Sequence, residues 1–256
     1  MTDATVFITG ATSGIGAACA RRFAREGRHL VLTGRRADRL AEMKRELEKG
    51  SRAKVHTILL DVRDKAAVDQ AISSLPAEFA AIDVLLNNAG LALGFEPAHQ
   101  VAISDWEGMV DTNVKGLLYV TRAVLPGMVA RDRGHIVSLG SVAGTYPYPG
   151  GNVYCGTKAF VHQFSLALRS DLLGTKIRVT CIEPGMVETE FAEVRFKGDK
   201  SKAKQLYAGM QPLTAEDIAD AIAWCTSRPW HFNVNTLELM PVAQAFGPFA
   251  VKRASS

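Results

Sequence analysis

Tyr154 and Lys158 stand four residues apart in the stretch "YCGTKAF", within a segment whose apolar residues have helical spacing. Residues at i and i+4 lie on one face of a helix, so the phenol and the ammonium group are expected to be neighbours. A free phenol has a pKa of about 10, and a nearby positive charge lowers that value. A tyrosine placed this way can exchange a proton with a substrate oxygen. The spacing alone is also compatible with ordinary packing.

Two serines precede this pair in the stretch "SLGSVAG", at Ser138 and Ser141. A serine hydroxyl can hydrogen-bond the same substrate oxygen that a tyrosine protonates. Small side chains at Gly156, Thr157 and Ala159 would let a flat cofactor ring approach the helix. These neighbours favour acid–base chemistry over packing as the reason for the tyrosine and the lysine.

Glycines dominate the stretch "TGATSGIG" near the N-terminus, at Gly10, Gly14 and Gly16. The loop follows an apolar run and precedes a helical pattern, where a helix N-terminus can hold a pyrophosphate. Glycine permits a tight turn, a close approach of the backbone to phosphate, and close packing of helix on strand. Ser13 and Ile15 are predicted to bind the dinucleotide with these glycines. A mere tight turn is the alternative.

The residues after the second apolar run bear on the choice of dinucleotide. An acid at this place commonly holds the ribose 2′-hydroxyl of NAD, whereas arginine suits the 2′-phosphate of NADP. The chain has Gly34, Arg35 and Arg36 there, with no acid at the end of the run. The two arginines therefore predict NADP (NADPH) as the cofactor. Solvated charges at the start of a helix are the alternative.

Polar residues also follow the third and fourth apolar runs. Asp61 and Val62 follow the third, and the carboxylate could accept a hydrogen bond from an adenine amino group or cap a helix. The fourth run leads into "NNAG", where Asn87, Ala89 and Gly90 are predicted to lie beside the cofactor. The same residues could instead lock a loop.

The elements that must position these residues follow from the hydrophobic pattern. Short β-branched runs alternate with longer helical patterns, which is typical of βαβ units around a parallel sheet. The pattern predicts an α/β fold, a single Rossmann-type doubly wound domain over residues 1–256 with a seven-stranded parallel sheet flanked by helices. Ligands bind beyond the carboxyl ends of such strands. The predicted strands cover residues 5–9, 29–33, 54–60, 83–87, 135–139, 177–183 and 236–240.

Some element boundaries can also be predicted. Ser104 and Glu107 have the spacing of a capping box, which would open a helix containing Asn113. Pro126 predicts a bend or break in the helix that follows. Asn152, after "PYPGG", is the expected N-cap of the helix that carries the tyrosine and the lysine.

Composition limits the class of protein. The chain has 30 basic and 26 acidic residues among 256, a net charge of +4 with no basic stripe, which disfavours a nucleic-acid partner. No basic leader or apolar run of membrane-spanning length occurs, so a cytoplasmic protein without a membrane partner is expected. No CxxC, HExxH or HxxxH spacing is present, so no metal site is expected. The four cysteines, expected to be buried small side chains, are Cys19, Cys155, Cys181 and Cys225.

These motifs, taken in order, resemble the short-chain dehydrogenase/reductase family over nearly the whole chain. The resemblance implies a catalytic tetrad in which Tyr154 is the acid or base and Ser141 orients the substrate. Lys158 would hold the nicotinamide ribose and lower the phenol pKa, and Asn113 would position a proton-relay water. Many members have serine where this chain has Gly140. Further cofactor contacts implied by the resemblance are Pro184, Gly185, Val187 and Thr189.

The segment of about 186–212 is expected to be a substrate lid, because it is the long variable stretch after the sixth predicted strand. It carries Arg195 between apolar residues, and arginine suits the grip of a carboxylate, although an exposed lid charge is as reasonable a reading. The stretches "NNAGLALGFEPAH", "VRFKGD" and "NTLELMPV" are similar to NADP-dependent 3-hydroxy acid dehydrogenases of the serine 3-dehydrogenase and malonic semialdehyde reductase types. The resemblance implies a small anionic substrate and a homotetramer.

Two alternatives stay open at this point. The same frame could reduce another carbonyl substrate, such as a 3-oxoacyl thioester, a sugar or a diketone. The chain could also be a dinucleotide-sensing protein without catalysis, although its intact tyrosine, lysine and serine disfavour that function. Near the C-terminus, Phe246 and Phe249 could pack against another subunit or within the chain.

Overall fold

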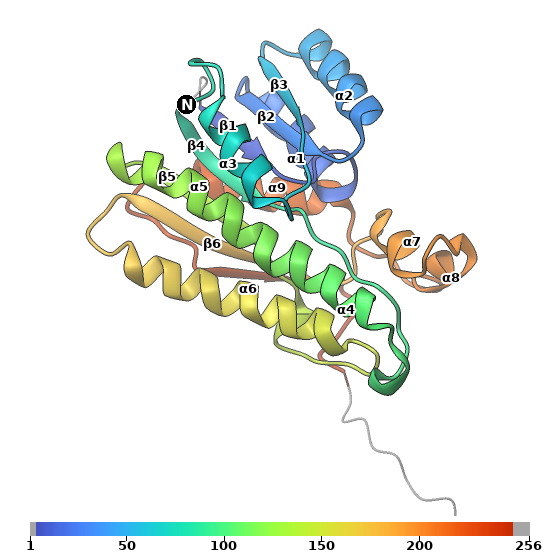
Figure 1. The fold of residues 1–256 in the computed structure, drawn as a ribbon. Helices are drawn as coiled ribbons and strands as arrows, with labels where there is room; N and C mark the ends of the chain where they lie inside the picture. The colour runs from blue at the N-terminus through green and yellow to red at the C-terminus, as the bar shows by residue number, and fades with distance from the viewer. Residues whose placement is uncertain (1–3, 248–256) are drawn as a thin grey trace, which may run out of the picture.

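Seven parallel strands form one sheet in the computed structural model, which describes residues 4–247. The strand order β3-β2-β1-β4-β5-β6-β7 reverses direction between β1 and β4, as in a doubly wound fold (Figure 1). The sequence prediction of this fold and of all seven strands is confirmed, with each strand end within one residue of its expected place. The strands are β1 (Thr5–Ile8), β2 (His29–Gly34), β3 (Val55–Leu59), β4 (Ile82–Asn87), β5 (Gly134–Leu139), β6 (Ile177–Pro184) and β7 (Thr236–Leu239).

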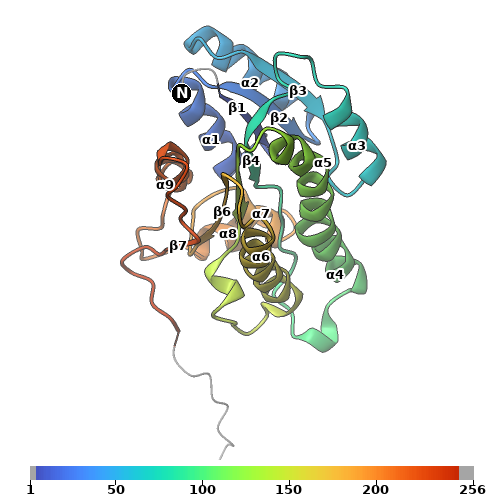
Figure 2. The same cartoon turned by 90° about the vertical axis from the view of Figure 1, so that its left-hand side faces the viewer.

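Helices cover both faces of the sheet, as parallel strands require because both of their faces must be buried. Figure 2 shows α1 and α9 on one side of the sheet and α3 and α5 on the other. The first layer consists of α1 (Gly14–Arg25), α2 (Ala37–Gly50) and α9 (Ala215–Ser227). The second layer consists of α3 (Lys65–Ser73), α5 (Leu117–Ala130) and α6 (Asn152–Asp171), with α4 (Ile103–Val110) against the start of α6.

Two short helices, α7 (Phe191–Arg195) and α8 (Lys200–Gln205), lie outside both layers (Figure 1). They belong to the segment between β6 and α9. The two ends of this segment are held together, because Val187 and Leu213 form an isolated parallel bridge. The backbone N–H of Leu213 donates to the carbonyl oxygen of Met186 at 3.0 Å. The segment therefore leaves the sheet and returns to it at one place.

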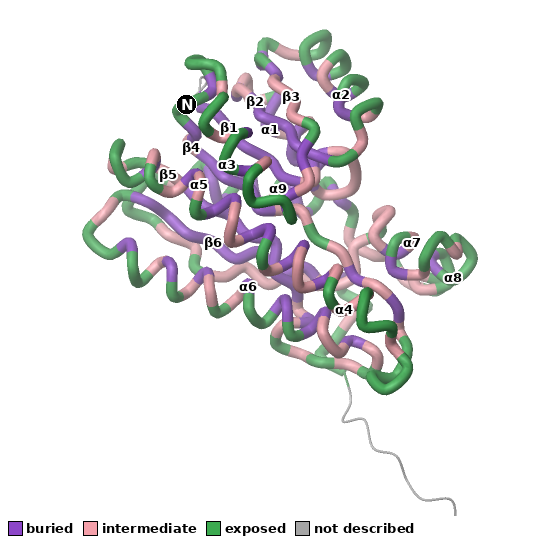
Figure 3. The backbone as a smooth tube through the Cα atoms, in the orientation of Figure 1, coloured by how far each residue is buried: buried purple, intermediate pink, exposed green. Residues whose placement is uncertain are grey.

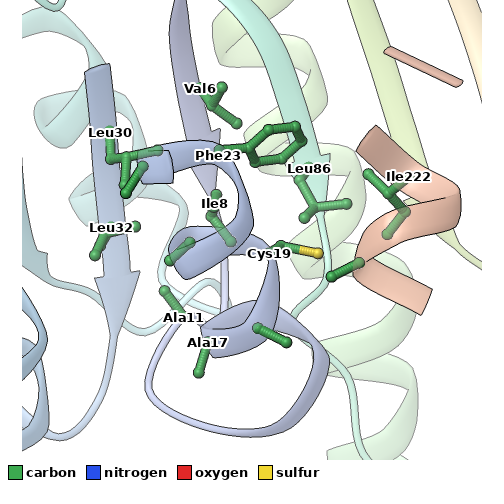
Figure 4. Packing of buried hydrophobic residues seen from close by; sticks show 14 of the residues in the cluster. Val6, Ile8, Ala11, Ala17, Cys19, Phe23, Leu30, Leu32, Leu86 and Ile222 are labelled. Carbon is green, nitrogen blue, oxygen red and sulfur yellow. The ribbon is translucent and has the colours of Figure 1, made fainter. Parts of the chain in front are cut away.

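Burial is greatest along the five central strands and less at the edge strands β3 and β7, as the backbone tube in Figure 3 shows. On the α1 side of the sheet, Phe23 packs among strand residues and meets Ile222 of α9 in the same hydrophobic cluster (Figure 4). On the other side, Met128 and Val124 of α5 close a second cluster against the sheet. These two cores fix the strands, so the loops at their carboxyl ends have a rigid base.

Several boundary predictions were wrong. No side-chain capping bond occurs at α4, which begins at Ile103, so Ser104 lies inside the helix and forms no capping box. Helix α6 is preceded by Gly151 as its N-cap, and Asn152 is its first residue, with a φ of 24°. Helix α5 runs through Pro126, so the break, one of the two predicted outcomes, does not occur. Between α4 and α5 the chain stays helical as a π-turn over Asp111–Gly116.

The described chain also bears on the compositional expectations. All four cysteines are free and buried, as expected. Among residues 4–247, no helix has the length and apolar character needed to cross a lipid bilayer. Phe246 packs against Tyr146 of the same chain, with ring centroids 4.7 Å apart. Phe249 lies outside the described residues.

Candidate functional site

A large cleft opens beyond the carboxyl ends of the strands, where the fold places ligands. Its volume is about 1160 Å³, and its walls come from the loops after β1 to β6 together with α6 and α7. The predicted site residues that line it are Gly10, Ser13, Gly14, Ile15, Arg35, Arg36, Asp61, Val62, Ala89, Gly90, Ser141, Tyr154, Lys158, Pro184, Gly185, Val187, Thr189 and Arg195. Gly16, Asn87 and Asn113 are not among its lining residues.

The glycine-rich loop has the conformation that its composition predicts. Gly10 and Gly14 have φ angles of +65° and +51°, which side chains with a Cβ rarely adopt. Gly16 instead permits close packing, because a Cβ there would lie 2.4 Å from the carbonyl oxygen of Gly10. The first two glycines therefore shape the cleft wall, and the third seats α1 behind it.

The two arginines after β2 differ in their surroundings. Arg36 is held by the protein: its Nε donates to Thr12 Oγ1 at 3.2 Å and its Nη1 to Glu190 Oε2 at 3.0 Å. Arg35 is exposed and forms no hydrogen bond or salt bridge with any other described residue. Arg35 is therefore the guanidinium that remains available to an anion in the cleft.

The acid after β3 lines the cleft but does not cap a helix. Asp61 accepts hydrogen bonds from the guanidinium and backbone N–H of Arg63, and the cap of α3 is Asp64. The hydrogen bond from the Arg63 side chain lowers the pKa of Asp61, so this carboxylate is charged at neutral pH. The helix-cap reading of Asp61 is therefore wrong.

The two asparagines of "NNAG" point in different directions. Asn87 is buried and its Nδ2 donates to Thr121 Oγ1 of α5 at 2.9 Å, away from the cleft. Asn88 lines the cleft, and its Nδ2 donates to the carbonyl oxygens of Thr9 and Gly10. The prediction of Asn87 at the cofactor is wrong by one residue, because alternate residues of a strand face opposite sides of the sheet.

Tyr154 and Lys158 line the same cleft from adjacent turns of α6, and both are buried. The Lys158 Nζ lies 5.8 Å from the centroid of the Tyr154 ring and donates to the carbonyl oxygen of Leu139 at 2.7 Å. Burial lowers the pKa of Lys158 to about 8. A single carbonyl partner leaves the other N–H groups of this ammonium free to donate.

The pKa of Tyr154 departs from the expectation. Burial raises the pKa of this phenol well above its ordinary value, and a hydrogen bond with Ser141 partly offsets the rise. The net shift of this pKa is therefore upward rather than the predicted lowering, because desolvation of the phenolate outweighs the effect of nearby charges. The phenol is protonated at neutral pH and is ready to act as an acid.

Ser141 and Ser138 have separate environments. Ser141 lies directly after β5, lines the cleft, and its Oγ donates to the carbonyl oxygen of Pro184 at 3.3 Å. Ser138 is buried within β5 and is not part of the cleft wall, so its predicted contact with substrate is wrong. Packing explains the glycine between them, because a Cβ at Gly140 would lie 2.8 Å from Cys181 Sγ.

Asn113 occupies the π-turn, and its side chain is held by the protein rather than exposed to the cleft. Its Oδ1 accepts from the backbone N–H of Leu91 at 2.8 Å. Its Nδ2 donates to the carbonyl oxygen of Leu91 and to Thr157 Oγ1. The side chain thus ties the loop after β4 to α6, three residues after Tyr154.

Arg195 lies at the end of α7 and is only 6% exposed. Its Cζ is 3.5 Å from the centroid of the Phe95 ring, and its Nη1 donates to Tyr148 Oη at 2.6 Å. No carboxylate within residues 4–247 forms a salt bridge with it, so the reading as an ordinary exposed charge is wrong. A buried guanidinium of this kind is chemically suited to an anion that enters the cleft.

Several residues that line this cleft have no recognisable signal in the sequence. Thr12 and Glu190 anchor Arg36, while Phe95 and Tyr148 surround Arg195. No motif signals them, because each contact joins segments that are far apart in the chain. A polar cluster of His162, Cys181 and Glu183 also carries no sequence signal; His162 Nδ1 and Cys181 Sγ each hydrogen-bond Glu183 Oε1.

Comparison with known protein families places this geometry in context. A family model described as short chain dehydrogenase matches residues 4–200. The NADP-dependent 3-hydroxy acid dehydrogenase YdfG of Escherichia coli K12 is 55% identical over 97% of this chain and 99% of its own length. The serine 3-dehydrogenase of Agrobacterium fabrum is 54% identical over 98% of this chain and 99% of its own.

Solved structures give the same picture. The closed form of a serine dehydrogenase complexed with NADP⁺ superposes with a TM-score of 0.94, at 55% identity, and covers 98% of this chain and 100% of that chain. The serine dehydrogenase of Escherichia coli superposes with a TM-score of 0.81, at 51% identity, and covers 94% and 99% of the two chains. The similarity thus extends over the whole fold, including the segment between β6 and α9.

Proposed function

The chain belongs to the short chain dehydrogenase family, and we propose on this basis that it is an NADP-dependent oxidoreductase acting on short 3-hydroxy acids and 3-oxo acids. The observation that carries the proposal is one cleft that contains a protonated phenol, Tyr154, and a buried guanidinium, Arg195. The phenol suits proton exchange with the 3-oxygen. The guanidinium suits the carboxylate of the same small molecule.

The residues present fit a dinucleotide with a 2′-phosphate. Gly10 and Gly14 form a wall without side chains, and a Cβ at Gly10 would come within 3.0 Å of Asn88 Nδ2. Arg35 offers a free guanidinium at the end of β2, where a 2′-phosphate is bound in such folds. The other expected contacts, Ser13, Ile15, Val62, Ala89, Pro184, Gly185, Val187 and Thr189, line the same cleft.

In the direction of reduction, Ser141 holds the substrate carbonyl oxygen and Tyr154 donates its proton to that oxygen. When bound, NADPH supplies a hydride at C4 of its nicotinamide, which reduces the carbonyl carbon. The resulting phenolate takes up a proton from solvent, so the balance is one hydride and one proton added. Lys158 holds the nicotinamide ribose and stabilises the phenolate as it forms. Asn113 keeps the loop after β4 in register with α6.

The segment of residues 186–212 acts in this proposal as the lid over the substrate end. Arg195 lies within it, and its backbone is bonded to the loop after β4, where the N–H of Gly94 donates to the carbonyl oxygen of Arg195 at 3.0 Å. The cleft wall thus gains a guanidinium only when this segment is in place. A lid of this kind excludes water from the reacting atoms.

By resemblance to the family, the assembly is a homotetramer in the cytoplasm. Large apolar side chains exposed around α9 and β7, including Trp224, Trp230 and Phe232, support an interface between copies of the chain. Light scattering coupled to size exclusion would measure the subunit number directly. A monomer at micromolar concentration would contradict this part of the proposal.

The substrate class can be tested with the purified protein. Racemic serine, threonine, 3-hydroxypropionate and 3-hydroxyisobutyrate are each supplied with NADP⁺, and the reaction is read at the nicotinamide absorbance. We expect turnover of free acids and much poorer turnover of their methyl esters. Equal rates for acid and ester would favour another carbonyl class, such as thioesters, sugars or diketones. No turnover with any such compound would favour a sensing protein.

The role of Tyr154 can be tested with Tyr154→Phe, which removes only the hydroxyl. We expect activity to fall by roughly 10³-fold, since general acid–base catalysis contributes about 10²–10⁴. NADPH binding, followed by nicotinamide fluorescence, should persist and shows that the variant is folded. Near-normal turnover in this variant would refute the assigned acid.

A further inference from the structure

Glu190 joins the two walls of the cleft. It lies just before α7, in the segment after β6, and its carboxylate bonds to two arginines at the start of α2. One oxygen, Oε2, is 3.0 Å from Arg36 Nη1, and the other, Oε1, is 2.6 Å from Arg39 Nη1. Both Glu190 and Arg36 line the cleft, so the contact bridges it from side to side.

Arg36 is itself held in place by other hydrogen bonds, so its contact with Glu190 has a fixed anchor. Arg36 Nε and Nη2 bond to Thr12 Oγ1 at 3.2 and 3.0 Å, which holds the guanidinium against the glycine-rich loop. Next to Glu190, Thr189 approaches the same loop, since a Cβ at Gly14 would lie 3.3 Å from the Thr189 Cβ. The start of α7 therefore lies over the part of the cleft bounded by that loop.

The role of Arg39 separates two readings of this contact. Glu190 could simply neutralise Arg36 and so weaken the attraction of the cleft for phosphate. That role would not need Arg39, which is not among the lining residues of the cleft. Each oxygen of the Glu190 carboxylate binds a different arginine, as expected of a contact that holds the segment before α7 against the start of α2. Burial tends to raise the pKa of Glu190, but hydrogen bonds from Arg39 and Arg36 lower it below its ordinary value, so the carboxylate stays charged.

We propose that Glu190 is a positioning residue that latches the lid over the coenzyme by binding Arg36 and Arg39. This inference rests on the proposed function, because the coenzyme is the molecule that the latch retains. The same short helix carries Arg195 at its other end, so the latch also fixes the position of the substrate guanidinium. The latch must open before coenzyme leaves, and its strength then limits the rate of release.

The experiment measures NADPH dissociation by stopped-flow fluorescence, with excess NADP⁺ as the chase. We expect Glu190→Gln and Arg39→Gln each to release NADPH about fivefold faster, equivalent to about 1 kcal/mol, because partly exposed ion pairs are worth this little. The double variant should be no faster than either single one, because both remove the same contact. Glu190→Asp, which keeps the charge, should restore part of the slow release.

Glu193→Gln is the matched control. It removes the same charge three residues further along the same segment, and Glu193 forms no side-chain hydrogen bond or salt bridge with residues 4–247. Its release rate should equal that of the parent. Parent-like rates in Glu190→Gln and Arg39→Gln would overturn the latch. Slower release in Glu190→Gln would overturn it too, and would mean that the carboxylate only screens Arg36. A parent protein that does not bind NADPH would refute the proposed function instead.

Discussion

The two ends of the cleft each present a guanidinium without a carboxylate partner among the described residues, yet they differ in exposure. Arg35, after β2, is exposed and has no bonded neighbour within the described chain. Arg195, at the end of α7, is buried, stacked on Phe95 and bonded to Tyr148. Arg35 can attract an anion directly from solvent. Arg195 can bind an anion only after that anion has lost its hydration water.

This difference separates attraction from selection. An exposed charge acts over distances of about 10 Å, and salt weakens it. A buried charge acts at contact, and it is costly unless an anion completes the site. We therefore expect the coenzyme end to set how readily NADPH binds. The substrate end should decide which molecules react.

The largest expected effect is at the buried end. Arg195→Met should lower kcat/KM for a free 3-hydroxy acid by roughly 100-fold, about 3 kcal/mol, because a charged hydrogen bond in a desolvated site is lost. The measurement is steady-state kinetics on the acid and its methyl ester. The ester should lose little, which makes it the internal control. An equal fall in kcat/KM for the acid and its ester would contradict the difference between the two ends of the cleft, since Arg195 would then only stabilise the fold.

A smaller effect is expected at the exposed end. Arg35→Ala should raise KM for NADPH by roughly tenfold while KM for NADH stays nearly constant, because one charged contact with phosphate is lost. Arg36→Ala tests whether Arg36, rather than Arg35, binds the 2′-phosphate. The Arg36 guanidinium is already bonded to Thr12 and Glu190. We expect the preference for NADPH over NADH to decrease more in Arg35→Ala than in Arg36→Ala. Higher ionic strength should weaken NADPH binding in the parent. Equal use of both coenzymes by the parent would contradict the role of Arg35.

The smallest effect concerns stability at the buried end. Lys158 has a pKa of about 8 in the fold, against 10.5 for the free side chain, so the unfolded chain holds more protons between these values. Stability therefore rises with pH in this window. Relative to Lys158→Met, the parent should gain about 1 kcal/mol in the free energy of unfolding between pH 7 and pH 9. Urea unfolding at both pH values measures the change, and a constant difference would refute it.

The fold was predictable because its signals are local. Each strand is a short run rich in β-branched and apolar residues, and the central strands such as β1 and β6 are buried along their whole length. The helix starts were less predictable. Asn152 and Ser104 have side chains suitable for capping, yet the N-caps are Gly151 and Ala102. Tertiary contacts decide where these two helices begin. Asn152 Oδ1 instead accepts a hydrogen bond from Trp106 Nε1 at 3.1 Å.

The site divides in the same way. The glycine loop, Ser141 and the Tyr154/Lys158 pair could be named from spacing, since each motif lies on one element. The side of the sheet that Asn87 faces, and the hydrogen bonds that hold the Asn113 side chain away from the cleft, could not. The pKa of Tyr154 could not be predicted either, because it depends on how completely other segments enclose the phenol.

The sequence by itself determined the order of strands and helices, the glycines that admit a dinucleotide, and the polar residues that follow each strand. Local geometry is enough for these, because backbone conformation and side-chain period act over a few residues. Only the tertiary structure decided which arginine is free and which is bonded, and that Glu190 joins α7 to α2. These depend on contacts between segments that are far apart in the chain, which no local pattern encodes.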